Sequence, residues 1–256
     1  MNLSRFRLKE EDLQVVRQLQ DLFHGADKSH KVVYSHFLPP IYKHLIPEIM
    51  SDFRDLAYKM SGGYDQAESF MVMVYPDYLE PEFQGFAVCE LTYNSKYGEI
   101  GHRDVLGALM GLGIKRHLIG DILVDQGLVQ VFMEAAMADY ICSQIHKIGR
   151  VSVEISLKDP SQIEYSGPET QEVSMTVASL RLDALIAGVY QVSRAKACQD
   201  IQADRVKINH LPVNNSSKLV QEGDLLSVRG RGRAILKTIG SKTKKDRYKI
   251  IIEKYK

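Results

Sequence analysis

The sequence predicts an α+β protein in three parts: a helical N-terminal segment, a central α/β sandwich and a small basic C-terminal module. Three observations support this fold class. Apolar residues recur at helical spacing in residues 1–65, strand-like and helical stretches alternate in residues 66–158, and a helix pair followed by short strands occupies residues 180–256. Residues 159–179 are predicted to be a linker, because their first part contains Pro160, Gly167 and Pro168. A chain of 256 residues, 45% of them hydrophobic, is long enough for two or three domains with real cores.

The first part is predicted to be helical throughout. Apolar residues recur every three or four positions at Leu13, Val16, Leu19 and Leu22. Prolines at 39, 40 and 47 indicate helix starts or breaks, and Ser61-Gly62-Gly63 ends the region.

The second part alternates strands and helices in the order β-β-α-β-β-α-β. The predicted elements are strands at Phe70–Tyr75 and Gly85–Tyr93, a helix at His102–Met110, a hairpin of His117–Val124 and Leu128–Phe132, a helix at Glu134–Lys147 and a strand at Val151–Leu157. This order predicts one compact α/β sandwich over an open sheet.

The third part begins with two short helices. Leu182, Leu185, Ile186 and Val189 lie on one helical face, and Gly188 is expected to break that helix. Ser193 is a predicted N-cap for a second helix, Arg194 to about Gln202. Strands are expected at Val206–His210, Leu225–Arg229, Ala234–Ile239 and Tyr248–Ile252.

The charge of the chain is divided unequally. Residues 181–256 carry 17 Lys/Arg against 7 Asp/Glu, a net charge of +10, whereas residues 1–180 carry 16 against 25, a net charge of −9. The near-neutral total of +1 conceals this division. A small module with so many like charges attracts a polyanion, and nucleic acid is the expected polyanion because each neutralised phosphate releases counterions.

Several function classes lack their motifs. Cys89, Cys142 and Cys198 are widely separated, and His24, His30 and His36 have no metal-ligand spacing, so we expect free thiols and no metal. No nucleotide-binding, synthetase or hydrolase motif is present, and we expect neither catalytic residues nor a cofactor. No signal peptide or membrane span is predicted, which favours a cytoplasmic protein without membrane association.

Several spaced motifs in the C-terminal part resemble the S4-like RNA-binding domain, also called the αL motif. The motifs are Arg181-Leu182-Asp183, Ser193-Arg194-Ala195-Lys196, Val206-Lys207-Ile208-Asn209, Glu222-Gly223-Asp224 and Val228-Arg229-Gly230. Many such modules have glycine in the turn before the first strand, whereas this chain has Ala203-Asp204-Arg205. We expect the turn to form nevertheless, because Asp tolerates left-handed geometry.

The resemblance extends upstream. Gly101–Asp104, Gly107–Arg116 and Gly120–Ile122 are similar to the YlmH family of bacterial RNA-binding proteins. That resemblance implies an RRM-like central domain. It also implies association with ribosomal RNA of the large ribosomal subunit and with tRNA during the rescue, or quality control, of stalled nascent chains, and a link to cell division.

The αL resemblance predicts an RNA-binding surface around the second helix. Arg181 begins the first helix, and Ser193, Arg194, Lys196 and Gln199 lie on the second, whose first amides are expected to face a phosphate. The alternative is that Ser193 is only an N-cap and that the cations are solvated.

A second group of residues is predicted on the strands. Arg229, Arg231 and Arg233 alternate with glycines, and on an extended chain this spacing directs all three guanidiniums to one side, where the RNA backbone can approach. Lys207 and Asn209 are expected to add contacts. The alternative is a charged edge strand that protects against aggregation. The run Lys242–Arg247 is predicted to be a solvated loop.

His102, Arg103, Lys115 and Arg116 flank the first helix of the central part and are a possible second RNA surface. Basic residues near a helix C-terminus need no ligand, so a purely structural role is the alternative.

We therefore expect a non-catalytic RNA-binding protein of the ribosome. Two alternatives remain open: an RNA-modifying enzyme that uses the C-terminal module to hold its substrate, and a division-linked scaffold that binds a protein partner through its acidic N-terminal half.

Overall fold

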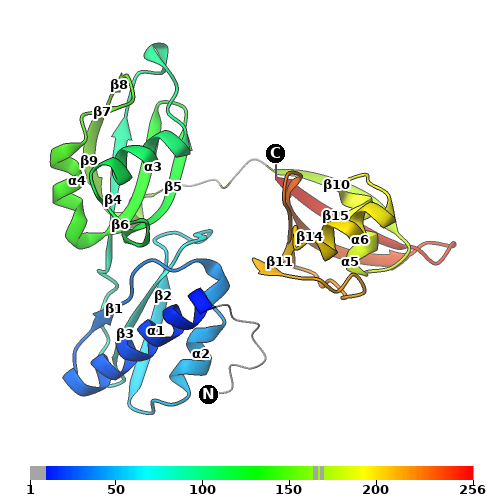
Figure 1. The fold of residues 1–256 in the computed structure, drawn as a ribbon, viewed down its shortest axis with the longest axis horizontal. Coiled ribbons are helices and arrows are strands. Elements are labelled where there is room, and N and C mark those ends of the chain that lie inside the picture. Colours follow the sequence, from blue (N-terminus) through cyan, green and yellow to red (C-terminus); the bar gives the residue numbers. More distant parts are fainter. Residues whose placement is uncertain (1–9, 164–166, 168–169, 256) are drawn as a thin grey trace. The chain divides into compact units, whose positions relative to one another are not determined.

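The computed structural model describes residues 10–163, 167 and 170–255. The chain forms two compact units, Met1–Tyr165 and Ser166–Lys256, and each is considered by itself (Figure 1). No helix of the described residues is long and apolar enough to cross a membrane.

The first unit begins with helices packed on a small antiparallel sheet. Its elements are α1 (Glu10–Ser29), β1 (Val33–Tyr34), η2 (Pro40–Tyr42), α2 (Leu45–Met50), β2 (Leu56–Ser61) and β3 (Met71–Pro76), with strand order β1-β3-β2. Val16, Leu19 and Phe23 of α1 pack with Ile46 of α2 against Val72 and other residues of β3. Every residue of β3 is buried, which explains its continuous apolar run.

Two predictions for this region are wrong. Residues 1–65 were expected to be helical throughout, but β1 and β2 are strands that pair with β3. The strand predicted at Phe70–Tyr75 was assigned to the central sheet, but it corresponds to β3 and lies in the N-terminal sheet. β2 is short and half-exposed, so its apolar period covers too few residues to be told from a helical one, and its pairing with the next strand, β3, decides its conformation. The three-part division of the chain stays a prediction.

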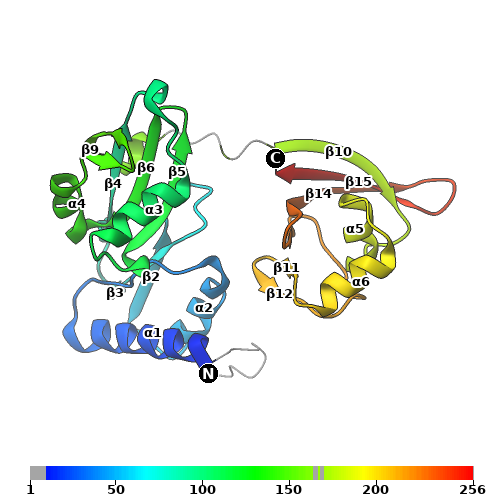
Figure 2. The same cartoon turned by 45° about the horizontal axis from the view of Figure 1, so that its top comes forward.

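The central sheet has the strand order β5-β6-β4-β9, with all neighbours antiparallel (Figure 2). Its elements are β4 (Phe86–Thr92), η3 (Ser95–Tyr97), α3 (His102–Gly111), η4 (Arg116–Leu118), β5 (Ile119–Asp125), β6 (Leu128–Glu134), η5 (Ala135–Met137), α4 (Ala138–Gln144), β7 (Lys147–Ile148), β8 (Val151–Ser152), β9 (Glu154–Lys158) and η6 (Pro160–Gln162). The main elements follow the β-α-β-β-α-β order of a split βαβ fold, which confirms the RRM-like architecture.

Both faces of the central sheet are used inside the first unit. Leu91 and Val131 face α3 and α4 and pack with Leu109 and Ile141. On the other face, Phe86 and Phe132 pack against residues that precede this sheet, Phe37 and Met71 among them. The Asp121 carboxylate of β5 accepts hydrogen bonds from the Tyr64 hydroxyl and from the amides of Glu68 and Ser69, at 2.7 to 3.0 Å. The N-terminal sheet and the central sheet are thus joined by a shared apolar cluster and by these hydrogen bonds.

The second unit is a curved six-stranded sheet with two helices on one face. Its strand order is β10-β15-β14-β13-β11-β12, and its elements are β10 (Thr170–Val177), α5 (Leu182–Val189), α6 (Arg194–Gln202), β11 (Val206–Ile208), β12 (Leu211–Pro212), β13 (Leu225–Val228), β14 (Gly232–Lys242) and β15 (Tyr248–Tyr255). Leu182, Leu185, Ile186 and Val189 are buried as predicted and face the sheet. Asp204 has φ 54°, so the turn before β11 forms without glycine.

The predicted linker, residues 159–179, is wrong over residues 170–177. These residues form β10, which pairs along its whole length with β15. β10 is an edge strand of eight residues, four of them exposed, and its partner β15 lies far away in the sequence, so its pairing is not visible from local signals. The remaining part of the linker includes residues 164–166, 168 and 169, which lie outside the described residues.

Gly188 was predicted to break the first helix of this unit, and this prediction is wrong. Gly188 lies within α5. A Cβ at this position would stand 3.4 Å from the Met175 sulfur and 3.5 Å from a methyl group of Val177, both on β10. These are ordinary van der Waals distances, so α5 packs on β10 at this position with room for a Cβ, and the glycine is not required by space.

Candidate nucleic-acid interface

The two helices of the second unit place four of the predicted residues near one another in the fold. Arg181 occupies the N-cap position of α5 with extended backbone, and Ser193 caps α6 because its Oγ accepts a hydrogen bond from the Lys196 amide at 3.1 Å. Arg194 follows the cap directly. The predicted N-cap is confirmed, and it orients the first turn of α6.

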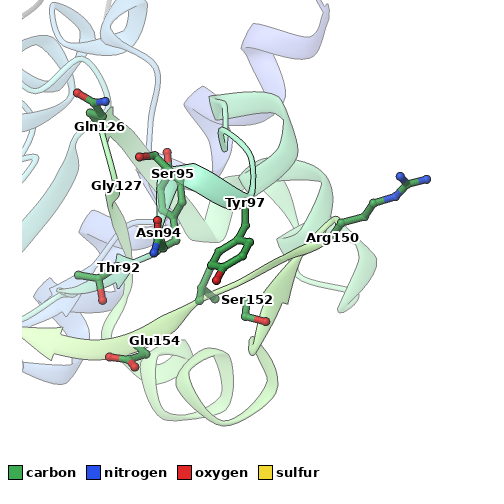
Figure 3. A pocket seen from close by; sticks show the side chains of 11 residues that line it. Thr92, Asn94, Ser95, Tyr97, Gln126, Gly127, Arg150, Ser152 and Glu154 are labelled. Carbon is green, nitrogen blue, oxygen red and sulfur yellow. The ribbon is translucent and has the colours of Figure 1, made fainter.

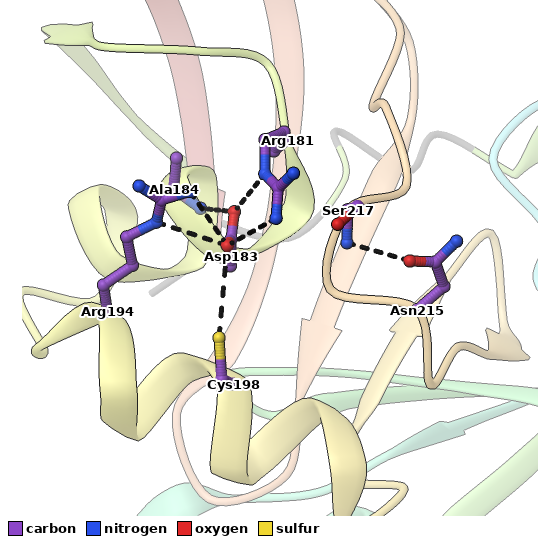
Figure 4. Close-up of polar contacts among 7 residues, drawn as sticks. All are labelled: Arg181, Asp183, Ala184, Arg194, Cys198, Asn215 and Ser217. Carbon is purple, nitrogen blue, oxygen red and sulfur yellow. Dashed lines mark hydrogen bonds and ion pairs between the residues drawn. The ribbon is translucent and has the colours of Figure 1, made fainter.

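A buried carboxylate holds both arginines. Asp183 is 3% exposed, and its two oxygens accept hydrogen bonds from the Arg181 guanidinium at 3.1 and 3.2 Å (Figure 4). One of these oxygens also accepts two bonds from Arg194, at 3.0 and 3.2 Å, and the Ala184 amide donates to the other at 2.8 Å. Asp183 therefore links the start of α5 to the start of α6.

The ionisation of Asp183 follows from these contacts. Burial alone would raise the pKa of this carboxyl, but the hydrogen bonds and positive charges of Arg181 and Arg194 outweigh burial and lower the pKa below its usual value. The carboxylate is therefore ionised at neutral pH.

A second buried carboxylate gathers three more cations. Asp200 of α6 is 4% exposed and lies 3.3 Å from the Lys196 ammonium, one helical turn away. The Arg205 and Arg231 guanidiniums each approach it to 3.6 Å, from the turn before β11 and from the turn between β13 and β14. Asp200 thus draws residues from three parts of the unit to one side of α6.

Two carboxylates against five cations leave a surplus of positive charge. We call Arg181, Arg194, Lys196, Arg205 and Arg231 the cation cluster. The side chains of this cluster remain 33% to 56% exposed, whereas the carboxylates beneath them are almost fully buried. The ion pairs fix the cations in place without neutralising them, and the exposed donors remain able to bind an anion.

The arginine–glycine run is not an extended strand, and this prediction is wrong. β13 ends at Val228 and β14 begins at Gly232, so Arg229 and Arg231 lie in the turn between the strands. Gly230 and Gly232 have φ of 79° and 92°, a left-handed geometry that glycine adopts without strain. The glycines therefore close the turn, and the turn brings Arg231 to Asp200.

Arg233 and Lys207 lie on the opposite face of the sheet from the helices. Lys207 pairs with Ser227, and Ser227 pairs with Arg233, so the three side chains share one face. Their strand neighbours Val206 and Val228 point into the core beneath α5 and α6. The Arg233 guanidinium stands 5.0 Å above the Tyr255 ring. These two cations are therefore not part of the cation cluster.

The remaining predicted residues of this unit differ in role. Gln199 is exposed on α6, close in sequence to the cluster. Asn209 is used within the fold: its amide donates to Asp224 at 2.7 Å, and its carbonyl accepts from the Leu225 amide at 2.9 Å. This pairing closes the turn before β13, and we leave Asn209 out of the proposed interface.

The possible second surface is not gathered into one patch. His102 and Arg103 lie in the first turn of α3, whereas Lys115 and Arg116 follow its other end. The helix of 10 residues separates the pairs by about 15 Å, given the rise of about 1.5 Å per residue. Arg116 donates to the carbonyls of Ile119 and Gly120, which favours the structural alternative for this residue.

Sequence reasoning missed three residues that build the cluster. Asp183 was noted only as a member of a motif and Arg205 only as part of a turn, and Asp200 was not predicted as a site residue. The i, i+4 spacing of Lys196 and Asp200 is a visible signal, but the contacts of Arg205 and Arg231 depend on the fold of distant turns. Among the described residues, no group of three or more His, Cys, Asp or Glu side chains is arranged to hold a metal ion.

Comparisons with known proteins found a matching domain family in each of the two units. The S4 domain matches residues 180–226, and a domain described as a putative RNA-binding domain in YlmH matches residues 80–162. Ribosome-associated protein quality control protein P2 of Bacillus subtilis (strain 168) is 34% identical over 233 residues, which are 90% of each protein. The solved structure of the cell division protein ylmH from Streptococcus pneumoniae is 25% identical, with a TM-score of 0.54, over 62% of this chain and 98% of that one.

Proposed function

This chain belongs to the YlmH family, and from that premise we propose that it is a non-catalytic RNA-binding protein that acts on the ribosome through the cation cluster of its second unit. The observation that carries the proposal is the surplus of charge: five half-exposed cations on two buried carboxylates. Fixed cations at defined spacing suit the phosphates of a folded RNA, because RNA helices are recognised largely by shape and backbone.

The proposed partners are the large ribosomal subunit and tRNA, and the proposed process is the rescue of stalled nascent chains. The support is the name of the Bacillus subtilis relative, which refers to ribosome-associated quality control, together with identity along most of both chains. A ribosomal partner implies a cytoplasmic location. Arg181, Arg194, Lys196, Arg205 and Arg231 are the proposed phosphate ligands, with Ser193 as the cap that orients them and Gln199 and Arg229 beside them.

The test compares two double substitutions that remove the same charge. R194Q/K196Q removes two members of the cation cluster, and K244Q/K245Q removes two exposed cations from the turn between β14 and β15. Binding to purified large ribosomal subunits is measured by sedimentation over a range of salt concentrations. We expect R194Q/K196Q to weaken binding at least 10-fold and to lower the salt slope by about 0.7 to 0.9 for each phosphate that is no longer neutralised.

The control variant K244Q/K245Q is expected to weaken binding less than threefold, because its cations contribute only general attraction. Thermal unfolding of both variants checks that the fold is kept. Equal weakening in the two variants would show that charge alone, and not the cluster, binds the ribosome.

A division-linked role is a second candidate, favoured by the name of the Streptococcus pneumoniae structure and by the acidic residues 1–180. A pull-down with the full chain, with and without nuclease, distinguishes the two. Protein partners that remain after nuclease treatment support a scaffold, whereas partners that disappear were bridged by RNA.

A further inference from the structure

The first unit contains an open cavity of about 990 Å³ at one end of the central sheet (Figure 3). It lies between the end of β4, the turn from β5 to β6, and strands β8 and β9. Most of the lining residues are polar, and the full set is Thr92, Tyr93, Asn94, Ser95, Tyr97, Gln126, Gly127, Arg150, Ser152, Val153 and Glu154. The volume is at the upper end of the range for sites that bind small ligands, roughly 300 to 1,000 Å³.

An exposed aromatic ring stands at this cavity. Tyr97 is 79% exposed, and within the part of the chain that the structure describes its side chain has no hydrogen-bonding or aromatic partner. The loop that carries it is well anchored: the Asn94 side chain accepts from the Lys96 amide at 3.0 Å, and the Tyr93 hydroxyl accepts from the Ile100 amide at 3.3 Å. A large ring held in water on an ordered loop is a surface on which another flat group can stack.

The usual aromatic surface of an RRM-like sheet is closed in this protein. Such domains stack RNA bases on aromatic side chains of the central strands, here β4 and β6. Phe86 and Phe132 hold these positions, but they are 9% and 0% exposed because Phe37 and Met71 cover them. A base cannot reach them while the first unit is folded.

We propose that the cavity beside Tyr97 is the RNA site of the central domain and that it takes an unpaired nucleotide. All residues that line the cavity lie within residues 80–162, which match the putative RNA-binding domain. The base stacks on Tyr97, and the side chains of Asn94, Gln126 and Ser152 offer hydrogen bonds to its edge. Arg150, exposed in the turn between β7 and β8, faces solvent at the rim and binds the adjoining phosphate. This inference rests on the proposed RNA-binding function but concerns the other unit.

The test uses the full chain and two fluorescein-labelled probes: an eight-nucleotide single-stranded RNA of random sequence, and an RNA duplex with no unpaired base. Affinity is measured by fluorescence anisotropy for the original protein and for Y97A, Y97F and Y78A. Tyr78 is a matched control because it is 69% exposed and lies outside the cavity.

We expect Y97A to weaken single-strand binding about 5- to 100-fold, the effect of losing one stacked base, and to leave duplex binding unchanged. Y97F keeps the ring and is expected to keep the affinity. Y78A is expected to match the original protein. Equal affinity of Y97A and Y78A for the single strand would overturn the proposal, and so would an equal weakening by Y97A on both probes.

Ultraviolet crosslinking of the single-stranded probe, followed by mass spectrometry of the peptides, separates this inference from the proposed function. Crosslinks at Tyr97 support the inference. Crosslinks confined to residues 181–256 overturn it and leave the role of the cation cluster intact.

Discussion

Asp183 shows how one buried charge organises a surface. Its carboxylate accepts hydrogen bonds from two arginines and from one amide, all on α5 and α6 or at their starts. A buried carboxylate is costly unless it is paired, so the arginines stabilise the fold in addition to their proposed role in binding. Each then presents its remaining donors to solvent. The same side chains therefore stabilise the unit and form the proposed interface.

Replacement of Asp183 by Asn is expected to destabilise the protein by about 2 to 3 kcal/mol at pH 7, because charge-assisted hydrogen bonds disappear while the half-exposed arginines rehydrate. Urea unfolding measures the change. D204N is the control, since Asp204 is exposed and Asn also tolerates its left-handed φ of 54°. It is expected to change stability by less than about 0.5 kcal/mol.

The effect of D183N is expected to depend on pH. The pKa of Asp183 is lowered in the folded state, so its contribution is fully present above the unfolded pKa of about 3.9 and disappears as the pH falls through the folded value. The difference in stability between the original protein and D183N should therefore be constant above about pH 4 and shrink progressively as the pH falls below it. A constant difference down to pH 2 would contradict this account.

At the scale of elements, the turn between β13 and β14 decides which cations meet. Gly230 and Gly232 adopt left-handed φ, and Arg231 reaches Asp200 from this turn. We expect G230A to cost about 1 to 2 kcal/mol, the penalty for an L residue in this conformation. No atom lies within 4 Å of a Cβ built at Gly230, so the cost would be conformational and not steric.

Urea unfolding of G230A measures this cost, and G107A provides the control. Gly107 lies in α3 and also has nothing within 4 Å of an added Cβ, but its φ is ordinary for a helix. That substitution is expected to stabilise the protein by up to about 1 kcal/mol. A destabilisation of both variants would show that added volume, and not φ, is responsible.

The elements that the sequence predicted well are those with strong local signals. The buried face of α5, the Ser193 cap and the hairpin at Asp125-Gln126-Gly127 each follow from period, capping or turn chemistry. The elements missed, β2 and β10, are partly exposed strands. β10 pairs with β15, which lies far away in the sequence, whereas β2 pairs with the next strand, β3. The sequence predicted cations on a helix pair and on a strand. Their division between the two faces of the sheet depends on the turn between β13 and β14, which the sequence did not predict.

At the scale of the whole molecule, charge and fold divide the chain at nearly the same place. The second unit has its own apolar core, drawn entirely from residues 177–252, and its own closed set of paired strands. Residues 1–180 carry the net negative charge and residues 181–256 the positive charge. The net negative charge of residues 1–180 therefore weakens the overall attraction of the chain for a polyanion, although a local site can still bind one.

We expect a fragment of residues 166–256 to fold alone and to bind non-specific RNA more tightly than the full chain does at low salt. Circular dichroism and cooperative urea unfolding check the fold, and anisotropy with a duplex RNA checks the affinity. The difference between fragment and full chain should disappear by about 0.5 M salt, where charges more than a few ångströms apart are screened. An unfolded fragment would show that the core of the second unit is insufficient by itself.

β10 and β15 also determine where the ends of the second unit lie. Thr170 stands opposite Tyr255 in an antiparallel pair, so the first and last strands of the unit are neighbours at one edge of the sheet. A circular permutant could therefore connect residue 255 to residue 170 with a short peptide and open the chain at the exposed turn near Lys244. For the same reason, a fluorophore attached at residue 255 would report on Thr170, the first residue of β10.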